Sequence, residues 1–266
     1  MASMTRDDVF RELDSVFPLA ASFIDQDFTG ANLRHLNLAG AEFLRATFTG
    51  ADLSRVSFYG AELTRVSLSK ATMEEVDFRD ASICDSDFSG AELRFSQFLD
   101  ATMGTTRFDG ADVSYASFNK VSFRDVSFVG ANLTNSRLTF RTGSGDVSGD
   151  VNFENADLTS AFIEGRLAGQ SNFRGANLTD ADLSALKALR TDFTGADLTG
   201  AVLPKDIGDP KQLLGARGSR IKLHQTTWDQ LLPDDPHTQN LARELLEDWG
   251  GTIGEAIETA KTLRTA

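Results

Sequence analysis

Cysteine is almost absent from this chain of 266 residues, because Cys84 is its only one. A single cysteine cannot form a disulfide within the chain, and it provides no cysteine pair for metal or redox chemistry. The three histidines, His35, His224 and His237, have no metal-ligand spacing with each other or with Cys84. The sequence therefore predicts no metal and no cofactor, and it is typical of a reducing compartment.

Basic residues are also scarce, with 26 Lys and Arg against 39 Asp and Glu and a net charge of −13. A sequence-independent nucleic-acid binder needs clustered Lys and Arg, so direct binding to nucleic acid is not expected. No apolar run approaches the ~18 residues of a membrane span. No basic segment is followed by an apolar one, as it would be in a signal peptide. We therefore expect a cytoplasmic protein that does not contact membranes.

Catalytic motifs are missing as well. No Gly-x-Ser-x-Gly sequence occurs, and the stretch from Gly143 to Gly149 lacks the Lys and the strand-to-helix context of a P-loop. Carboxylates are plentiful, but acids at regular spacing are more often a solvated face than a catalytic pair. The chain is therefore not expected to be an enzyme, and its function is expected to be binding through a surface.

What the sequence does have is a bulky apolar residue at every fifth position from Phe23 to Leu203. The exceptions on this spacing are Gly143, Ser148, Ala168 and Ala188. Most positions two residues before each bulky one hold Ala or another small or β-branched residue. A helix would repeat every 3.6 residues and a strand every two. A period of five therefore predicts a repeat architecture whose backbone turns a corner at each unit.

The units Ala31-Asn32-Leu33, Ala51-Asp52-Leu53, Ala131-Asn132-Leu133 and Ala196-Asp197-Leu198 resemble those of the pentapeptide-repeat family. The resemblance covers residues 21–203 and implies an all-β solenoid, a right-handed quadrilateral β-helix with four units in each 20-residue coil. Residues 20 apart should then stack in ladders. Interior ladders account for the 20 Phe beside only 2 Tyr and 2 Trp, because a core column offers no partner to a hydroxyl or an indole N–H.

Three segments are expected. Residues 1–20 form a helix that caps the first coil, with Thr5 and Asp8 as its capping pair. Residues 21–203 form the β-helix. Residues 204–266 contain two amphipathic helices, one beginning at Asp235-Pro236 and one with a capping box at Thr252 and Glu255. They either cap the solenoid or form a homodimer interface, and the residues predicted for such an interface are Leu241, Leu245, Trp249, Ile253 and Ile257.

The repeat is interrupted at residues 139–152. Either two degenerate units continue the wall, or the wall closes with fewer units and a Gly-, Ser- and Asp-rich loop protrudes. The glycines and the lack of apolar centres favour the loop. Ala168 and Ala188 share a wall with Ser148, which indicates a narrowing, bulge or small loop there. Loop residues predicted to contact a partner are Phe140, Arg141, Asp146 and Asp150.

Two outward features indicate a protein partner. Phe95 and Tyr115 should stack beside Arg94, and exposed aromatics with Arg are typical interface anchors. Acidic residues fall into columns, for which the predicted partner-binding members are Asp52, Glu92 and Asp112, with Asp192 as a further example.

Several pentapeptide-repeat proteins mimic DNA, occupy the DNA-binding saddle of type II topoisomerases and protect DNA gyrase from antibiotics. The resemblance implies the same partner here, DNA gyrase or topoisomerase IV. Residues 21–203 carry a net charge of only −9. Duplex DNA as long as about nine coils would carry about 26 charges. The alternative is therefore a generic interaction scaffold or effector that binds another protein.

Overall fold

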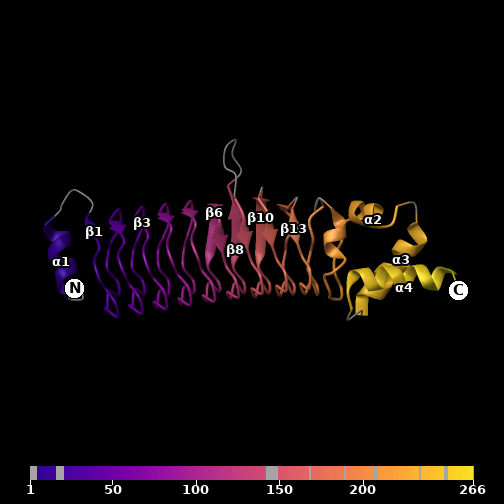
Figure 1. Ribbon diagram of the computed structural model, residues 1–266, viewed down its shortest axis with the longest axis horizontal. Coiled ribbons are helices and arrows are strands. Elements are labelled where there is room, and N and C mark those ends of the chain that lie inside the picture. Colours follow the sequence, from indigo (N-terminus) through magenta and orange to yellow (C-terminus); the bar gives the residue numbers. More distant parts are fainter. Residues whose placement is uncertain are drawn as a thin grey trace.

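The computed structural model describes residues 5–15, 21–141, 149–167, 169–188, 190–205, 209–233, 235–248 and 251–265. It is a rod with helix α1 (Arg6–Ser15) at one end and helices α2 (Gln225–Leu231), α3 (Pro236–Asp248) and α4 (Ile253–Thr265) at the other (Figure 1). A 3-10 helix, η1 (Pro210–Leu213), precedes α2. Between the ends lie thirteen short strands: β1 (Ser22–Ile24), β2 (Glu42–Leu44), β3 (Glu62–Thr64), β4 (Ser82–Cys84), β5 (Thr102–Gly104), β6 (Ser117–Arg124), β7 (Val126–Ser127), β8 (Arg137–Phe140), β9 (Val151–Asn152), β10 (Phe162–Leu167), β11 (Ser171–Asn172), β12 (Leu186–Ala188) and β13 (Thr191–Asp192).

All strand pairs are parallel and join one coil to the next. The nine-stranded sheet has the order β1-β2-β3-β4-β5-β6-β8-β10-β12, and the four-stranded sheet the order β13-β11-β9-β7. Phe23 pairs with Phe43 and Phe43 with Leu63, so neighbouring strands are offset by one 20-residue coil. The predicted right-handed quadrilateral β-helix is confirmed.

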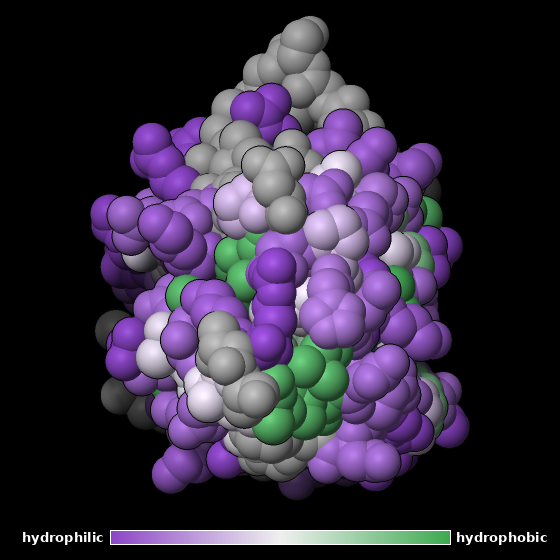
Figure 2. Space-filling model, turned by 90° about the vertical axis from the view of Figure 1, so that its right-hand side faces the viewer, coloured by the Kyte–Doolittle hydropathy of each residue, from purple (hydrophilic) through white to green (hydrophobic). Residues whose placement is uncertain are grey.

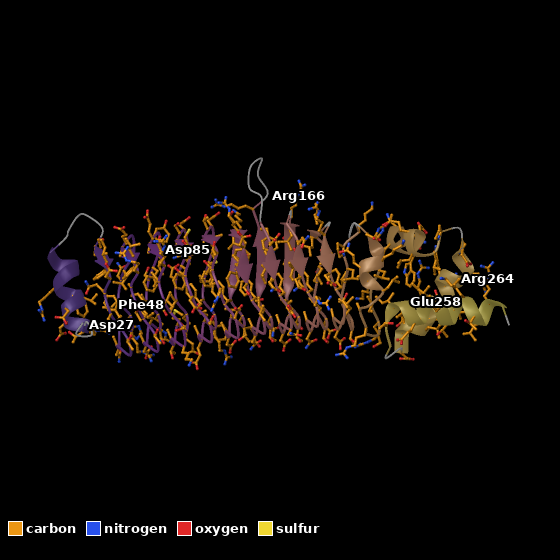
Figure 3. The ribbon with its side chains drawn as sticks, in the orientation of Figure 1. Asp27, Phe48, Asp85, Arg166, Glu258 and Arg264 are labelled. Atoms are coloured by element: carbon orange, nitrogen blue, oxygen red, sulfur yellow. The ribbon has the colours of Figure 1, made fainter. Side chains whose placement is uncertain are left out.

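We number the four walls from the first coil. Wall 1 carries Phe23, wall 2 Phe28, wall 3 Leu33 and wall 4 Leu38, and each wall continues in the following coils. The bulky residue of each unit points into the rod, as Phe48 does in Figure 3. The small residue two positions before it also points inward. The remaining positions form the surface of the walls and corners.

The corners are made by residues with positive φ. Gly30, for example, has a φ of 65°, Arg55 of 60° and Asp85 of 53°. The amide of Ala31 donates to the carbonyl of Phe28 at 3.0 Å, which closes the turn around Gly30. A turn of this kind with a positive φ at its third residue has type II geometry. A five-residue unit can turn a corner because one of its residues adopts this conformation.

The core contains the predicted ladders of phenylalanines. On wall 4 the ring centroids of Phe58 and Phe78 are 5.1 Å apart, those of Phe78 and Phe98 5.0 Å, and those of Phe98 and Phe118 4.4 Å. The planes are nearly parallel, at 3–6°. Each ring is fully buried, so each coil provides the apolar surface that covers the next, as in other repeat proteins.

Buried hydroxyls replace alanine at some inward positions, where those of Ser86, Ser96 and Thr106 donate to backbone carbonyls, while those of Ser136, Ser171 and Thr191 have no partner among the described residues. The Ser96 hydroxyl donates to the carbonyl of Met73 at 2.9 Å, and the Ser86 hydroxyl donates to the carbonyl of Cys84 at 2.9 Å. Thr106 donates to the carbonyls of Gly104 and Ile83, at 3.0 and 3.3 Å. Because the small position lies against these backbone carbonyls, a buried hydroxyl is tolerated there.

The N-terminal end is covered by α1. Thr5 and Asp8 form the predicted capping pair, with the Thr5 amide 2.9 Å from Asp8 Oδ2 and the Asp8 amide 3.3 Å from Thr5 Oγ1. Val9 is buried, and Arg6 Nη1 donates to the carbonyl of Arg34 at 2.7 Å. The bond to Arg34 holds the helix against the first coil.

The C-terminal helices are fastened to the last coil. The amide of Ile253 donates to the carbonyl of Ala216 at 2.9 Å, and the amide of Arg220 to the carbonyl of Leu246 at 2.8 Å. The predicted capping box is present, since the Thr252 amide lies 2.7 Å from Glu255 Oε2. Helix α2, with the buried Trp228, was not predicted. No helix in the described part of the chain is long and apolar enough to cross a bilayer.

The strand register shows how the chain passes the interruption. Val126 pairs with Val151 and Asn132 with Asp157, an offset of 25 residues instead of 20. The Arg141 amide donates to the carbonyl of Val121 at 3.0 Å, whereas the Gly149 amide donates to that of Phe123 at 2.8 Å. One coil therefore holds five residues more than its neighbours, and the extra length lies between Arg141 and Gly149.

A second irregularity occurs where Ala168 and Ala188 lie in the sequence. Phe162 pairs with Asp182, but Gly165 pairs with Leu186, so the offset rises from 20 to 21 residues, and it returns to 20 where Ser171 pairs with Thr191. Gly165 has a φ of 107°, and a Cβ atom there would lie 2.9 Å from the carbonyl oxygen of Phe140. The extra residue of the bulge lies between Asp182 and Leu186, opposite the segment that ends at Gly165, and only glycine fits the conformation and close approach at Gly165.

We predict that Gly165→Ala destabilises the protein more than Gly110→Ala does. Both glycines have positive φ, so both changes should lose about 1 kcal/mol or more through backbone strain. Only at Gly165 would the new methyl group also meet backbone atoms, since a Cβ at Gly110 has nothing within 4 Å. Thermal and denaturant unfolding of the two variants measures the difference, and equal losses would contradict the bulge described here.

Candidate functional site

Several acids in the N-terminal half of the rod form ion pairs with arginines. Asp25 accepts from Arg45 at 2.6 Å, Glu75 pairs with Arg55 at 3.1 Å, and Asp77 with Arg79 at 2.8 Å. Further pairs include Arg34–Asp52, Arg65–Asp85 and Arg107–Asp87. Most of these pairs join consecutive coils along one column. Each of these pairs cancels its own charges locally, whereas Glu42 and Glu62 on wall 1 have no Lys or Arg within 4.0 Å in the described ranges.

Asp52, which was predicted to bind a partner, is one of these paired acids. Burial raises the pKa of its carboxyl, but hydrogen bonds from Ser54 and from the Arg34 guanidinium outweigh burial and leave the pKa below its usual value. Its Oδ1 accepts from the amide and the hydroxyl of Ser54, at 3.1 and 2.7 Å. Asp52 therefore stabilises the turn that follows it.

The acids of the C-terminal half are arranged differently. On walls 2 and 3 they are held by neutral donors: Asp157 Oδ1 accepts from the amide and hydroxyl of Thr159, at 3.0 and 2.6 Å, and Asp112 Oδ1 accepts from the Ser114 amide and from Asn132 Nδ2, at 3.0 and 3.1 Å. Neutral donors fix the carboxylate without cancelling its charge. We define the acidic strip as Asp109, Asp112, Glu154, Asp157 and Asp197, which neutral donors hold, together with Glu92, which lies one coil before Asp112 in the same column.

Few cations lie near the acidic strip. Arg107 lies 3.8 Å from Asp109 and Arg217 3.9 Å from Asp197, while Arg174 lies on wall 2 and pairs with Asp192 at 3.0 Å. Within the described ranges no Lys or Arg lies within 4.0 Å of the other four members. Four members of the strip, Glu92, Asp112, Glu154 and Asp157, therefore display their charge without a cation within 4.0 Å, as Glu42 and Glu62 on wall 1 also do in the part of the chain that the structure describes.

The predicted Glu92 and Asp112 belong to this strip, and the other members were missed. A signal was present in the sequence, because Asp or Asn is followed two residues later by Ser or Thr in units such as Asp157-Leu158-Thr159 and Asn177-Leu178-Thr179. This spacing lets the side chain accept from the amide two residues on. Asp and Asn can therefore make the same hydrogen bond in this turn, and they differ only in the charge of the side chain.

The aromatic pair lies where it was predicted. The rings of Phe95 and Tyr115 are stacked with centroids 5.1 Å apart, and the side chains are 43% and 48% exposed. The Arg94 guanidinium lies 5.5 Å from the Phe95 centroid. Both aromatics occupy the corner between walls 3 and 4.

The predicted loop residues have structural roles. Phe140 is only 3% exposed and packs edge-on against Phe123 at 5.7 Å, so its prediction as a partner contact was wrong: the ring belongs to the core. Arg141 donates to the carbonyls of Lys120 and Asp100, at 3.2 and 3.0 Å, and so links three coils. Asp150 Oδ1 accepts from the Gln170 amide at 2.7 Å. Asp146 lies outside the described residues.

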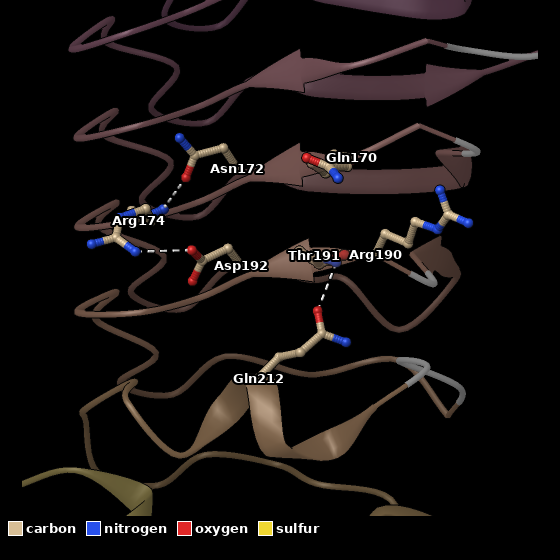
Figure 4. Close-up of a pocket in the computed structure, with 8 residues that line it drawn as sticks. Gln170, Asn172, Arg174, Arg190, Thr191, Asp192 and Gln212 are labelled. Atoms are coloured by element: carbon tan, nitrogen blue, oxygen red, sulfur yellow. Dashed lines mark hydrogen bonds and ion pairs between the residues drawn. The ribbon is translucent and has the colours of Figure 1, made fainter.

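An open hollow of about 410 Å³ lies over the four-stranded sheet beside η1 (Figure 4). Its polar groups largely bind one another: Arg174 Nη1 donates to Asp192, and the Thr191 amide donates to Gln212 Oε1 at 2.6 Å. No histidine or cysteine is among its lining residues. In the described part of the chain no group of three or more His, Cys, Asp or Glu is placed to hold a metal ion.

The residues predicted to form a dimer interface are mostly used within the chain. Ile253 is fully buried and Ile257 is 4% exposed, so they cannot also face a second molecule, and this part of the prediction was wrong. Leu241 and Leu245 are half-buried against the same core, and Trp249 lies outside the described residues. An apolar patch remains at this end of the rod (Figure 2), and Leu263 of α4 is 54% exposed.

A family model described as pentapeptide repeats matches residues 27–65, 61–96, 106–139 and 168–200, which is more than half of the chain. The chain belongs to the pentapeptide-repeat family. No curated protein gives a significant match.

Solved structures of other family members resemble it. HetL, a pentapeptide-repeat protein involved in heterocyst differentiation regulation in Nostoc sp. strain PCC 7120, is 21% identical over 82% of this chain and 98% of its own, with a TM-score of 0.31. The Arabidopsis thaliana thylakoid-lumen protein AT2G44920 is 30% identical over 39% and 70%, with a TM-score of 0.30. QnrB1, a plasmid-mediated fluoroquinolone resistance protein, is 21% identical over 76% and 91%, with a TM-score of 0.28.

The arginine-paired acids predict how stability depends on pH. Hydrogen bonding to Arg45 lowers the pKa of Asp25 and hydrogen bonding to Arg55 lowers that of Glu75, from ordinary values of 3.8 and 4.5. The unfolded chain therefore takes up protons first, so their stabilisation is complete above about pH 5 and is lost as the pH falls through 4 and below.

Denaturant midpoints measured between pH 7 and pH 3 test this dependence. In Arg45→Gln the Asp25 carboxylate has lost its partner, so the drop in the midpoint at acidic pH should be smaller than in the natural sequence. An equal or larger drop in the variant would contradict the assignment.

Proposed function

We propose that this protein is a non-enzymatic binding rod whose acidic strip docks on a basic surface of a type II topoisomerase, DNA gyrase or its relative topoisomerase IV. The observation that carries the proposal is the display of Glu92, Asp112, Glu154 and Asp157 without local counter-ions. A DNA-binding surface is lined with Lys and Arg, and it is complementary to such a strip.

The magnitude of the charge defines what kind of binding this is. Coils are spaced about 4.8 Å apart, so a column with one carboxylate per coil has about a third of the charge density of DNA, which carries one charge per ~1.7 Å. Asp112, Asp157 and Asp197 occupy alternate coils of one column, with Asn132 and Asn177 between them. The strip therefore acts by steering and orientation on a basic surface, not by copying the phosphates one for one.

A second candidate is a scaffold that binds another protein through its aromatic side chains. The exposed pair of Phe95 and Tyr115, with Arg94 over one ring, favours it, because such residues anchor interfaces. The two candidates differ in salt dependence. Binding through the acidic strip should weaken steeply with salt, and binding through aromatics should not.

A gyrase supercoiling assay tests the first candidate. The purified protein at micromolar concentration should inhibit supercoiling or rescue it from a quinolone. If it does neither, the topoisomerase assignment is wrong.

Charge-neutralising variants test the strip itself. Asp112→Asn/Asp157→Asn should lower the apparent affinity for gyrase about tenfold, because two charge contacts are lost. Folding should be unaffected, because Asn132 and Asn177 already make the same bonds to their Thr at these positions. The matched control is Glu42→Gln/Glu62→Gln, which removes two acids from wall 1. Equal losses in the two variants would show that only net charge matters and would reject the strip as the contact.

A further inference from the structure

Aromatic residues exposed on the repeat gather along wall 4 and its edge. Tyr59 is 47% exposed on this wall, Phe95 and Tyr115 lie at its corner with wall 3, and Phe162 is half-buried further along. Each part of this row has an arginine over a ring: Arg79 lies 5.8 Å from the centroid of Tyr59, and Arg137 4.0 Å from that of Phe162. Aromatics paired with Arg are the residues most enriched at interfaces.

The middle of wall 4 carries no charge on its outward side. Gln97, Leu99, Ser117 and Asn119 occupy it, and all are exposed or half-buried. Ion pairs frame it at both ends. Arg79–Asp77 at 2.8 Å and Arg55–Glu75 at 3.1 Å lie toward the N-terminus, and Arg137–Glu164 at 3.6 Å lies toward the C-terminus. An uncharged centre within a charged rim is the anatomy of a protein interface.

The aromatic pair is placed at a conformational cost. Phe95 has a φ of 61° and Tyr115 of 58°, and a residue with a Cβ loses about 1–2 kcal/mol in this conformation relative to glycine. The same corner holds residues with side chains at positive φ in other coils too, such as Arg55 and Asn135. Stacking of two half-exposed rings returns only about 0.5–1.5 kcal/mol. What distinguishes Phe95 and Tyr115 from the other corner residues is therefore their exposed, stacked rings and not their backbone conformation.

We propose that wall 4 is the contact surface of an antiparallel homodimer, with a two-fold axis crossing the wall at Leu99. The charges at the corner between walls 4 and 1 select a second copy as the occupant. Asp80 lies one coil before Asp100 and Lys120 one coil after it. Arg141 pairs with Asp100 at 3.3 Å, whereas Asp80 and Lys120 have no oppositely charged residue within 4.0 Å in the described ranges.

The two-fold axis passes through Leu99, lies in the plane of the interface and is perpendicular to the rod. It places Asp80 of each molecule opposite Lys120 of the other, so the pair forms twice. Leu99 and Phe95 then face their own copies at the centre. A parallel arrangement would instead oppose the corner of Asp80 to the corner of Glu75, which brings like charges together. With a net charge of −13 on each chain, two copies can approach closely only where the surface is neutral.

The size of the wall sets the strength of the contact. From Tyr59 to Glu164 the wall crosses five coil spacings, or about 24 Å, and only one of four walls takes part. The buried area is therefore at the low end for specific interfaces, and the dimer should be weak, with a dissociation constant in the micromolar range or above. Most of the acidic strip, on walls 2 and 3, stays outside this contact.

Sedimentation velocity of the full chain tests the proposal without any topoisomerase, so its result is independent of the proposed function. Over protein concentrations from about 1 µM to about 1 mM, the sedimentation coefficient should rise from that of a monomer toward that of a dimer. Leu99→Arg places two like charges on the axis and should abolish the rise. A chain that stays monomeric throughout would overturn the proposal.

A charge-swap cycle tests the geometry. Asp80→Lys and Lys120→Asp should each weaken association at least tenfold, because each opposes like charges twice, and the double variant should recover most of the loss. Leu263→Arg is the control at the C-terminal end and should have no effect. Association that survives Leu99→Arg, is lost in Leu263→Arg, or is not recovered in the double swap refutes a contact through wall 4. Far-UV circular dichroism of each variant establishes that the coil is intact.

Discussion

One residue with positive φ in each five-residue unit, unbroken from Asp25 to Asn135, is the constraint on which this structure depends. Each such corner with a side chain is strained by about 1–2 kcal/mol, and isolated units would not adopt it. The strain is offset because each turn places the next wall against the neighbouring coil, where backbone hydrogen bonds form. The Phe28 amide donates to the Thr47 carbonyl at 2.7 Å, and the Thr47 amide donates to the Gln26 carbonyl at 2.9 Å. Corners, hydrogen bonds and the phenylalanine ladders are therefore stable only together, which makes the rod cooperative from coil to coil.

The same constraint separates the positions that make the fold from those that are free to vary. The inward bulky and small positions are set by the width of the coil, whereas the outward positions need only bond locally or face water. At the outward column of wall 3, Asp157 and Asn177 make the same bonds to Thr159 and Thr179. The surface charge can therefore change without altering the fold. Some acids, such as Asp25 and Glu75, are paired with arginines, whereas others, such as Asp112 and Asp157, are held by neutral donors that leave the charge displayed.

The period of five was enough to predict the coil and the inward ladders, and the three-residue spacing of Thr5 with Asp8 and of Thr252 with Glu255 predicted both capping pairs, because each depends on contacts at a fixed spacing along the chain. It was not enough at the interruption, where five added residues leave the period unchanged, and only the register of Val126 with Val151 reveals the insertion. Phe140 and Ile253 were predicted to lie in interfaces, because the sequence does not distinguish an exposed interface residue from a core residue where the repeat is broken. Their burial depends on distant partners, Phe123 and the last coil, which periodicity does not specify.

The two binding surfaces differ in physical character and lie on different sides of the square. The acidic strip depends on long-range charge, so it acts before contact and is sensitive to salt. Wall 4 has a neutral centre, so it acts only at contact, through aromatic area and a small number of paired charges. Because wall 2 is opposite wall 4, a molecule associated through wall 4 still presents that side of the strip. Pairing two copies in opposite directions would place two strips on the outside of one particle, and a bivalent particle gains avidity for a symmetric partner without any stronger single contact.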